Sequence, residues 1–553
     1  MNNDFPTPTL FETSLSTPKI FLLSIIMNPS SFILVLFSIT LAVALARRFL
    51  RSKKPKDQQL PPGPLGWPII GNMVQMIMNR PAHLWIHRVM EELQTEIACF
   101  RFASFHVITI TSSKIAREML REKDEVLADR SESYASHLIS HGYKNISFSS
   151  YGENWKLMKK VTTTKLMSQT TLSKTLGYRN LEADNIVTYV YNLCKLGSGR
   201  NLINVRDTIL TYCHATMMRM MFGQRHFDEA AEDGGLGPKE KEHMDAIYLA
   251  LDCFFSFNLT NYIPFLRGWN VDKEEAEVRE AVHIINKCND PIIEERIHLW
   301  RKKGGKDMEE DWLDILITLK DDQGMPLFTF DEIRAQCKEI NIATIDNTMN
   351  NVEWTLAEML NHPEIFEKAT NELDMIVGKD RLVQESDIPK LNYIKACSRE
   401  SFRLHPANVF MPHHVAREDT TLAGYFVPKG GQILVSRLGL GRNPKIWDEP
   451  NTFKPERHLD GHVENSLGVN LMEQDMRFVT FGTGRRSCPG TKVGASMTIM
   501  LLARLLQGFE WSLPHGKSHV ELISAESNLF MAKSLLACAK PRLAPSLYPK
   551  IQT

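Results

Sequence analysis

The feature that most restricts how this 553-residue chain can fold is the loop Phe481–Gly490, which directly precedes an apolar helix predicted over Thr491–Gln507. The loop reads Phe-Gly-Thr-Gly-Arg-Arg-Ser-Cys-Pro-Gly. Its glycines let the backbone approach a flat ligand closely, because no Cβ intervenes. Cys488 lies at the mouth of the helix, where the helix dipole and adjacent cations favour thiolate over thiol. Arg486 is placed to pair with an anionic group of the same ligand.

A thiolate presented in this way is suited to ligate a haem iron, and its electron donation favours cleavage of an O–O bond. A lone Cys in a turn is more often a small buried residue. The pattern F-x-x-G-x-R-x-C-x-G, however, arises by chance in on the order of one chain in ten thousand. The loop therefore indicates a haem-thiolate site with Cys488 as the metal ligand.

Composition argues against other classes of site. The nine Cys residues include no C-x-x-C pair, so we expect neither a disulfide scaffold nor a zinc module. Lys plus Arg and Asp plus Glu both number 65, and this balance argues against a nucleic-acid-binding protein. Apolar residues make up 43% of the chain, enough for a large buried core.

An uncharged run extends from Ile20 to Ala46; Asn28–Ser31 interrupts it, and it is densest over Phe32–Ala46. A membrane-spanning helix needs about 20 apolar residues, so we expect a span from near Ser30 to near Leu50. Six Lys and Arg residues follow within Arg47–Lys56, so we expect the C-terminal side to stay in the cytosol. A cleaved signal peptide is the alternative, since Ala44–Ala46 resembles an A-x-A site, but the cationic cluster disfavours translocation. We assign residues 1–60 to an N-terminal extension, membrane anchor and basic linker, and residues 61–553 to one globular domain.

The pattern of the globular part predicts a mainly α fold with a minor β portion. Ile97–Phe102 and His106–Thr111 are typical of a hairpin, and the stretches 420–427 and 432–436 are also β-rich. The clearest helix is predicted over Phe330–Leu360, where Thr329 and Glu332 form a capping box. No Pro/Gly-rich linker divides this part, which favours one large domain.

The Cys488 loop resembles the haem-binding signature of the cytochrome P-450 family of haem-thiolate monooxygenases. Glu400-Ser-Phe-Arg403 resembles the E-x-x-R helix motif of that family, and Arg457 in Pro-Glu-Arg-His supplies its second arginine. The resemblance implies the cytochrome P-450 fold after one N-terminal transmembrane helix, a haem b ligated by Cys488, and a buried structural network of Glu400, Arg403 and Arg457.

The same resemblance implies which residues contact the haem. Within the loop these are Phe481, Gly484, Arg486 and Gly490. Trp155 and Lys159 look like the W-x-x-x-R/K pair that contacts a haem propionate, and His413 occupies the position of a further propionate partner; from the sequence alone, His413 is equally well a surface residue. The complete set of expected cofactor contacts is Trp155, Lys159, His413, Phe481, Gly484, Arg486 and Gly490.

The chain further resembles one plant subgroup, the amino-acid N-monooxygenases that convert an amino acid to its aldoxime. The similarity covers roughly Leu60 to Pro549 and includes the stretches 346–354, 439–445, 503–509 and 541–549 and His458. Several of these details are closest to members that use methionine-derived and other aliphatic amino acids, which feed glucosinolate biosynthesis.

Asp346, Asn347 and Thr348 are the expected catalytic residues of the long helix. Most cytochromes P-450 carry an acid followed by Thr, whereas here an amide follows Asp346, as in the subgroup. Asp346 and Asn347 are expected to order the water that delivers protons to oxygen. Alternatively, Asn347 binds the substrate carboxylate or amine, and Asp346 is structural. No arginine stands out as the partner of the carboxylate, and Thr348 stands where many subgroup members have Pro.

The resemblance implies an enzyme that uses O2 and electrons from NADPH–cytochrome P-450 reductase. It N-hydroxylates an amino acid twice and yields the aldoxime, with aliphatic or methionine-derived substrates favoured and aromatic ones allowed. We expect it on the endoplasmic reticulum membrane, in contact with lipid and not with nucleic acid, and with its catalytic domain, residues 61–553, in the cytosol. Two alternatives stay open, a carbon hydroxylase of a plant terpenoid or phenolic and a non-catalytic haem-binding sensor.

Overall fold

The structure is a computed structural model that describes residues 38, 58–196, 202–227, 231, 233–269, 271, 273–302, 306–459, 468–472, 476–525 and 529–550. Its α-helices are α3 Met73–Met78, α4 Ala82–Glu92, α5 Ser113–Arg117, α6 Tyr134–Ile139, α7 Glu153–Val161, α8 Gln169–Lys174, α9 Leu176–Leu196, α10 Val205–Phe222, α11 Pro238–Phe255, α12 Leu259–Tyr262, α13 Glu274–Arg301, α14 Trp312–Thr318, α15 Phe330–Asn361, α16 Pro363–Ile376, α17 Asn392–Leu404, α18 Arg437–Gly441 and α19 Thr491–Gly508. Its strands are β1 Ile97–Phe102, β2 Phe105–Ile110, β3 Asp129–Arg130, β4 Leu202–Asn204, β5 His414–Val415, β6 Thr420–Leu422, β7 Tyr425–Val427, β8 Gln432–Val435, β9 Phe509–Ser512 and β10 Leu536–Pro541.

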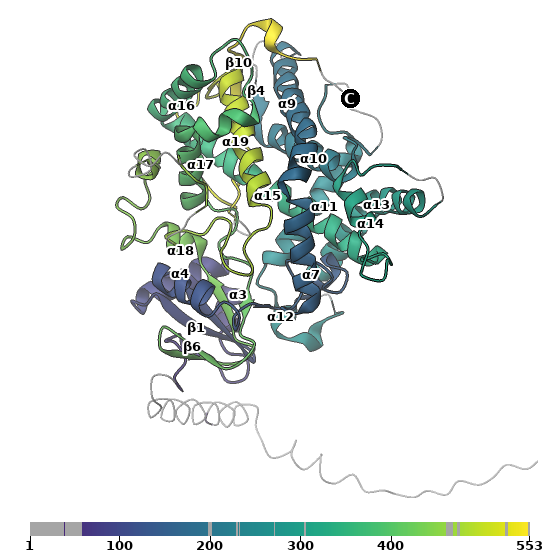
Figure 1. The fold of residues 1–553 in the computed structure, drawn as a ribbon. Coiled ribbons are helices and arrows are strands. Elements are labelled where there is room, and N and C mark those ends of the chain that lie inside the picture. The colour runs from purple at the N-terminus through teal and green to yellow at the C-terminus, as the bar shows by residue number, and fades with distance from the viewer. Residues whose placement is uncertain are drawn as a thin grey trace, which may run out of the picture.

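Helix α15 organises the core. Its N-terminus is closed by the predicted capping box, in which the Thr329 hydroxyl accepts from the Glu332 N–H and the Glu332 carboxylate accepts from the Thr329 N–H at 2.8 Å. The helix packs against α10, α17 and α19, and Figure 1 shows it running through the middle of the helical body. Helix α19, predicted from its apolar sequence, is buried along most of its length. These two helices fix the position of the residues between them.

A five-stranded sheet with the order β1-β2-β8-β5-β3 lies at one end of the molecule, and β4, β9 and β10 form a second sheet at the other end (Figure 1). The predicted hairpin is confirmed as the antiparallel pair β1 and β2. Strand β2 then pairs in parallel with β8, with Ile110 opposite Val435. This long-range pairing places the start of α18 beside the core.

The anchor predicted from about Ser30 to about Leu50 lies outside the described residues, apart from Ser38. Within the described part of the chain, no helix combines the length and the apolar character that crossing a membrane requires. All nine cysteines lie in the described part, and seven of them are buried as small core residues.

A buried carboxylate on α17 holds three cationic or polar partners from two segments. Glu400 accepts from Arg403 at 2.7 and 2.8 Å, from Arg457 Nε at 3.0 Å and from His458 Nε2 at 2.7 Å. Burial alone would raise the pKa of Glu400, but the hydrogen bonds from Arg403 and His458 lower it to about 2. Arg403 also donates to the carbonyls of Pro450 and Thr452. The network thus ties α17 to the chain that leads to the Cys488 loop.

We expect Glu400→Gln to lower the free energy of unfolding by about 3–5 kcal/mol, because Arg403 and Arg457 would stay buried without a counter-charge. Thermal unfolding of the haem-loaded protein, followed by loss of the haem absorption, measures this change. Glu510→Gln is the control, since Glu510 and Lys540 form a pair that is 60% and 75% exposed and should contribute less than about 1 kcal/mol. Equal effects of the two substitutions would contradict the prediction.

Candidate active site

A cavity of about 280 Å³ lies between α15 and the Cys488 loop. Its walls include Ile146 and Phe148 from the chain before α7, Ala343 and Thr344 from α15, and Met411 from the chain that leads into β5. Three stretches far apart in the chain, 134–150, 342–348 and 407–411, all contribute to its lining. Most of the wall is apolar, which is typical of a small-molecule site.

Cys488 lines this cavity and is exposed toward it. Its backbone N–H donates to the Phe481 carbonyl at 2.8 Å, which closes the loop, and its own carbonyl accepts from the Thr491 hydroxyl at 2.9 Å. Gly490 precedes α19, and a Cβ at Gly490 would lie 3.8 Å from the Cys488 sulfur. The sulfur therefore projects from a rigid loop into the space beneath α15.

Gly484 meets a steric requirement within the protein itself. Its φ is +71°, and a Cβ there would lie 2.5 Å from the Leu120 carbonyl oxygen and 2.7 Å from a carboxylate oxygen of Asp124. Glycine is therefore required because the loop presses on the chain around Leu120 and takes up a left-handed conformation. The expected contact of Gly484 with the haem stays a prediction.

Two effects oppose each other at the Cys488 thiol. Burial raises its pKa above the ordinary value, while the Gly490 N–H at the start of α19, Lys159 and Thr491 act to lower it. The expected contribution of the helix N-terminus and of the cation is therefore present beside the effect of burial. A coordinated metal ion would favour the thiolate further, because a ligating thiol is deprotonated outright.

Basic side chains surround the same cavity. Arg486 donates from Nε, Nη1 and Nη2 to the carbonyls of Ala128, Ile146 and Ser149 at 2.7 to 2.9 Å. Lys159 donates to the carbonyl of Ser487. Burial lowers the pKa values of both basic groups. These carbonyl bonds hold Arg486 and Lys159 beside the cavity, where an anionic group would relieve their desolvation.

Two further basic residues of the lining, Arg130 on β3 and Arg437 at the start of α18, were not singled out in the sequence. Arg130 donates to the carbonyls of Ser147, Pro412 and His413 at 2.9 to 3.2 Å. Arg437 could have been noticed as the first charged residue after the apolar run of β8. Neither lies in a motif, because both reach the cavity only through the sheet pairing of β2, β3, β5 and β8.

Neither Trp155 nor His413 is among the residues that line this cavity. The Trp155 indole N–H donates to the Ile146 carbonyl at 3.1 Å, and the Arg486 guanidinium lies over its ring at 4.6 Å. Trp155 thus supports Arg486 from behind. His413 lines a neighbouring cavity with Phe257 and Phe410, and its backbone carbonyl accepts from Arg130, which lines the active-site cavity. The His413 ring lies 6.1 Å from the ring of Phe257, and its contact with a haem propionate stays a prediction.

Asp346, Asn347 and Thr348 all line the cavity from α15. Asp346 accepts from the Asn408 amide at 3.2 Å, while its other carboxylate oxygen has no partner among the described residues. Burial raises the pKa of Asp346 to about 7, against the opposing effects of Asn408 and Arg437. The Thr348 hydroxyl contacts the Thr498 hydroxyl at 3.2 Å, so it bridges α15 and α19.

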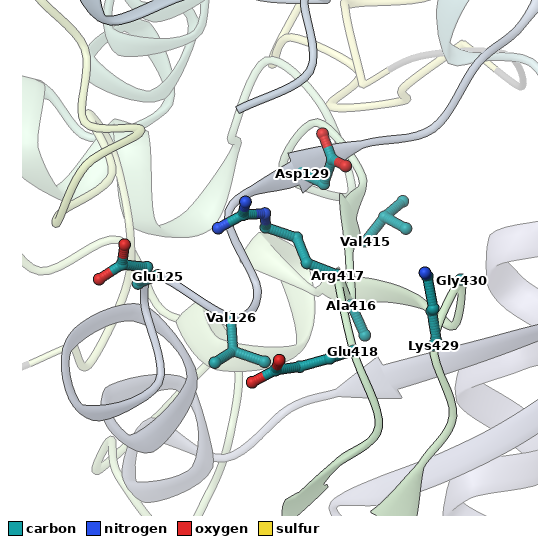
Figure 2. A pocket seen from close by; sticks show the side chains of 9 residues that line it. All are labelled: Glu125, Val126, Asp129, Val415, Ala416, Arg417, Glu418, Lys429 and Gly430. Carbon is teal, nitrogen blue, oxygen red and sulfur yellow. The ribbon is translucent and has the colours of Figure 1, made fainter. Parts of the chain in front are cut away.

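A second cavity, of about 710 Å³, is open, and its lining includes none of the residues expected to bind haem. Figure 2 shows that it is surrounded by side chains of mixed charge, namely Glu125, Asp129, Arg417, Glu418 and Lys429. It includes no residue of the Cys488 loop. We therefore place the active site in the smaller, more apolar cavity.

The residues of this cavity fit a haem. A thiol projects into it from one side, basic groups suited to two propionates stand at its border, and apolar side chains cover much of the remaining wall. This combination defines a haem-thiolate protein. Residues 61–537 match the sequence profile of the family described as Cytochrome P450. The chain belongs to the cytochrome P450 family, and it is a monooxygenase that holds haem through a cysteine and draws electrons from NADPH through a reductase.

Several curated proteins are similar over almost their whole length. The dihomomethionine N-hydroxylase of Arabidopsis thaliana is 50% identical, and the match covers 98% of this chain and 99% of that protein. The hexahomomethionine N-hydroxylase of the same plant is 50% identical over 94% of this chain and 97% of its own length. The tyrosine N-monooxygenase of Sorghum bicolor is 48% identical over 89% and 88%. The predicted subgroup is confirmed.

A solved structure, a zebra fish cytochrome P450 with progesterone, superposes with a TM-score of 0.67 at 22% identity. The match covers 84% of this chain and all of the other chain. At this identity the similarity shows the fold alone. The predicted mainly helical cytochrome P450 fold is confirmed.

We expect Cys488→Ala to abolish the thiolate signature in the carbon monoxide difference spectrum, because no other cysteine lines the cavity. The substitution Cys538→Ala is the control, since Cys538 lies on β10 in the other sheet and should leave the spectrum unchanged. The measurement uses reduced, haem-reconstituted protein. An unchanged spectrum for Cys488→Ala would show that another residue ligates the iron.

Asp346 should make stability depend on pH. Its pKa lies at about 7 in the folded chain, against 3.8 ordinarily. Between these values the folded state keeps a proton that the unfolded state loses, so stability falls as pH rises from about 4 to about 7. The loss is up to about 4 kcal/mol and should be absent in Asp346→Asn. Melting temperatures of both proteins across this pH range measure it; parallel curves would contradict the shift.

Proposed function

We propose that this enzyme is an amino-acid N-monooxygenase that hydroxylates the amine nitrogen of an amino acid twice and yields the aldoxime. The observation that carries the proposal is the similarity of about half of all positions to N-hydroxylases of dihomomethionine and hexahomomethionine, over nearly the entire chain. Relatives that act on tyrosine, isoleucine and tryptophan are 44–48% identical. Aliphatic and methionine-derived amino acids are therefore the favoured substrates, and aromatic ones are allowed.

The cavity supports a substrate with an uncharged side chain. Ile139, Ile340 and Phe254 are among its apolar lining residues. Burying a charged side chain among them would be unfavourable without a partner. The lining also holds polar and charged groups, among them Asp346, Asn347 and Arg437. These groups suit the amine and carboxylate of an amino acid, and the apolar residues suit a hydrocarbon, thioether or aromatic chain.

Bound haem supplies the activation of O2 with two electrons and two protons in each turn. The chain contributes the protons. Asp346, with a pKa of about 7, keeps a proton near neutral pH and exchanges it readily. Asn408 orients its carboxyl group through the hydrogen bond at 3.2 Å, and the neighbouring Asn347 lines the cavity with an amide in place of the usual hydroxyl. We assign Asp346 to proton delivery and Asn347 to ordering the water that carries the proton. After the second hydroxylation the product loses water and carbon dioxide.

We further propose that a single-pass anchor from about Ser30 to about Leu50 holds the enzyme on the endoplasmic reticulum membrane, with its catalytic domain in the cytosol and in contact with lipid. Exposed apolar side chains near the start of the domain support this placement, since Leu65 and Ile69 are 75% and 84% exposed. Phe265 and Trp269 are 78% and 75% exposed. These two groups lie at the same end of the molecule, because Phe102 bridges to Gly71 and its ring contacts Tyr262 at 5.0 Å. Such apolar surface is typical of membrane contact.

Electrons are proposed to come from NADPH–cytochrome P-450 reductase on the same membrane. The exposed Lys160 and Lys492 lie on α7 and α19 near the Cys488 loop and suit an acidic donor. Lys156 and Arg485 of the same face already pair with Glu153 and Glu125 at 2.8 and 2.9 Å. The net attraction of this face for a reductase therefore rests mainly on Lys160 and Lys492.

Reconstitution with a reductase and NADPH tests the function. We expect aldoxime from at least one amino acid in a panel of dihomomethionine, hexahomomethionine, methionine, leucine, isoleucine, phenylalanine, tyrosine and tryptophan. Mass spectrometry of the product measures it, and omission of NADPH is the control. Turnover of a terpenoid or phenolic alone would favour a carbon hydroxylase, and a haem-loaded protein without any turnover would favour a sensor.

A further inference from the structure

Arg437 is held at the cavity by its backbone. Strand β8 ends at Val435, and the Ser436 hydroxyl caps α18 by accepting from the Gly439 N–H at 2.8 Å. The Arg437 N–H donates to the Val409 carbonyl at 2.8 Å, which fixes the start of α18 beside the chain at residues 407–411. The side chain therefore enters the cavity lining from a rigid position.

The guanidinium of Arg437 differs from the other basic groups of the lining. Its Nε is fully buried and has no hydrogen-bond partner, and within the described ranges no carboxylate forms an ion pair with it. By contrast, Arg486 donates from all three of its guanidinium nitrogens to carbonyls, and Arg130 donates from Nε and Nη1. Unlike Arg486 and Arg130, Arg437 thus has guanidinium donors that the protein leaves available to a ligand.

The electrostatic surroundings of Arg437 also favour the binding of an anion. Burial lowers its pKa to about 10, while the charges of Asp346 and Cys488 act to raise it. The group remains cationic at neutral pH, since its pKa lies well above 7. An unpaired cation in an apolar cavity is unfavourable unless an anion with matching hydrogen-bond acceptors joins it. A carboxylate matches the planar guanidinium with two parallel hydrogen bonds.

We propose that Arg437 binds the α-carboxylate of the amino-acid substrate and is the residue that selects amino acids over amines. This inference rests on the proposed function. Two carboxylates can reach the cavity, that of the substrate and a haem propionate. Arg130, Arg486 and Lys159 already stand at the border of the cavity for the propionates, and Arg437 lies apart from their carbonyl bonds. Asp346, whose second oxygen lacks a partner, interacts with Arg437 across the site. With its carboxylate on Arg437, an amino acid would place its amine toward the Asp346 carboxyl group, which can accept a hydrogen bond in either protonation state.

The test compares an acid with its ester. Haem-loaded wild-type enzyme, Arg437→Gln and Arg437→Lys are titrated with dihomomethionine and with dihomomethionine methyl ester, and the substrate-induced shift of the haem absorption gives each Kd. Phenylalanine and its methyl ester form the second pair of probes. The control is Arg442→Gln, whose guanidinium donates to the Leu404 carbonyl at 2.9 Å and is absent from the cavity lining.

We expect Arg437→Gln to weaken binding of the free acid by about 10²-fold and to change binding of the ester by less than about 3-fold. Arg437→Lys should recover part of the difference, because it keeps the charge but not the paired donors. The carbon monoxide spectrum should show an unchanged haem content in both variants. Arg442→Gln should leave the ratio of acid to ester affinity as in the wild type.

Two results would overturn the proposal. Equal weakening of acid and ester together with loss of haem would assign Arg437 to a propionate. An unchanged ratio of acid to ester affinity with normal haem content would show that another group binds the carboxylate. Failure of the proposed function is distinguishable, because the wild-type enzyme would then form no aldoxime from any amino acid of the panel, whatever the variants do.

Discussion

The main constraint on the active site is that several ionisable side chains are buried around the sulfur of Cys488. Arg437 and Arg486 have pKa values lowered to about 10, and burial also lowers those of Arg130 and Lys159. The same desolvation raises the pKa of the Cys488 thiol. Burial therefore disfavours the charged form of each of these groups, and a partner of opposite charge stabilises that form. Haem would stabilise Cys488, Arg130, Arg486 and Lys159 together, since it would bring a metal ion to the sulfur and two carboxylates to the basic border, whereas Arg437 is left for the substrate carboxylate.

The protein holds these cations in place mainly through backbone carbonyls. Arg486 is fixed by three carbonyls from the segment 128–149, and Arg130 joins the same segment to the chain before β5. Carbonyl acceptors position a guanidinium without neutralising it, so the positive charge stays available to an anionic ligand. Elsewhere the chain uses carboxylates instead: Glu400 neutralises Arg403 and Arg457, and Glu353 neutralises Arg206. Arg130 and Arg486 thus keep a positive charge at the cavity that Arg403 and Arg206 lose to their carboxylate partners.

The residues that bind haem and those that bind substrate come from different elements of the fold. The Cys488 loop and its neighbours approach the cavity from one side, whereas Asp346 and Asn347 come from α15 on another. The fold is common to relatives with 22% identity, while the named amino-acid N-hydroxylases reach 50%. Variation in the lining residues of α15, the chain before α7 and α18 can therefore change the substrate while the haem site persists.

The sequence by itself determined the features that depend on neighbouring residues. The capping box of α15, the hairpin of β1 and β2, the apolar helix α19 and the Cys488 loop were all predicted, because caps, periodicity and turn residues act within a few positions. Only the tertiary structure decided that Arg437 and Asp346 line one cavity, that the His413 ring lies beside the ring of Phe257, and that burial raises the pKa of the Cys488 thiol. These properties arise from packing between segments far apart in the chain and from the solvent that this packing excludes.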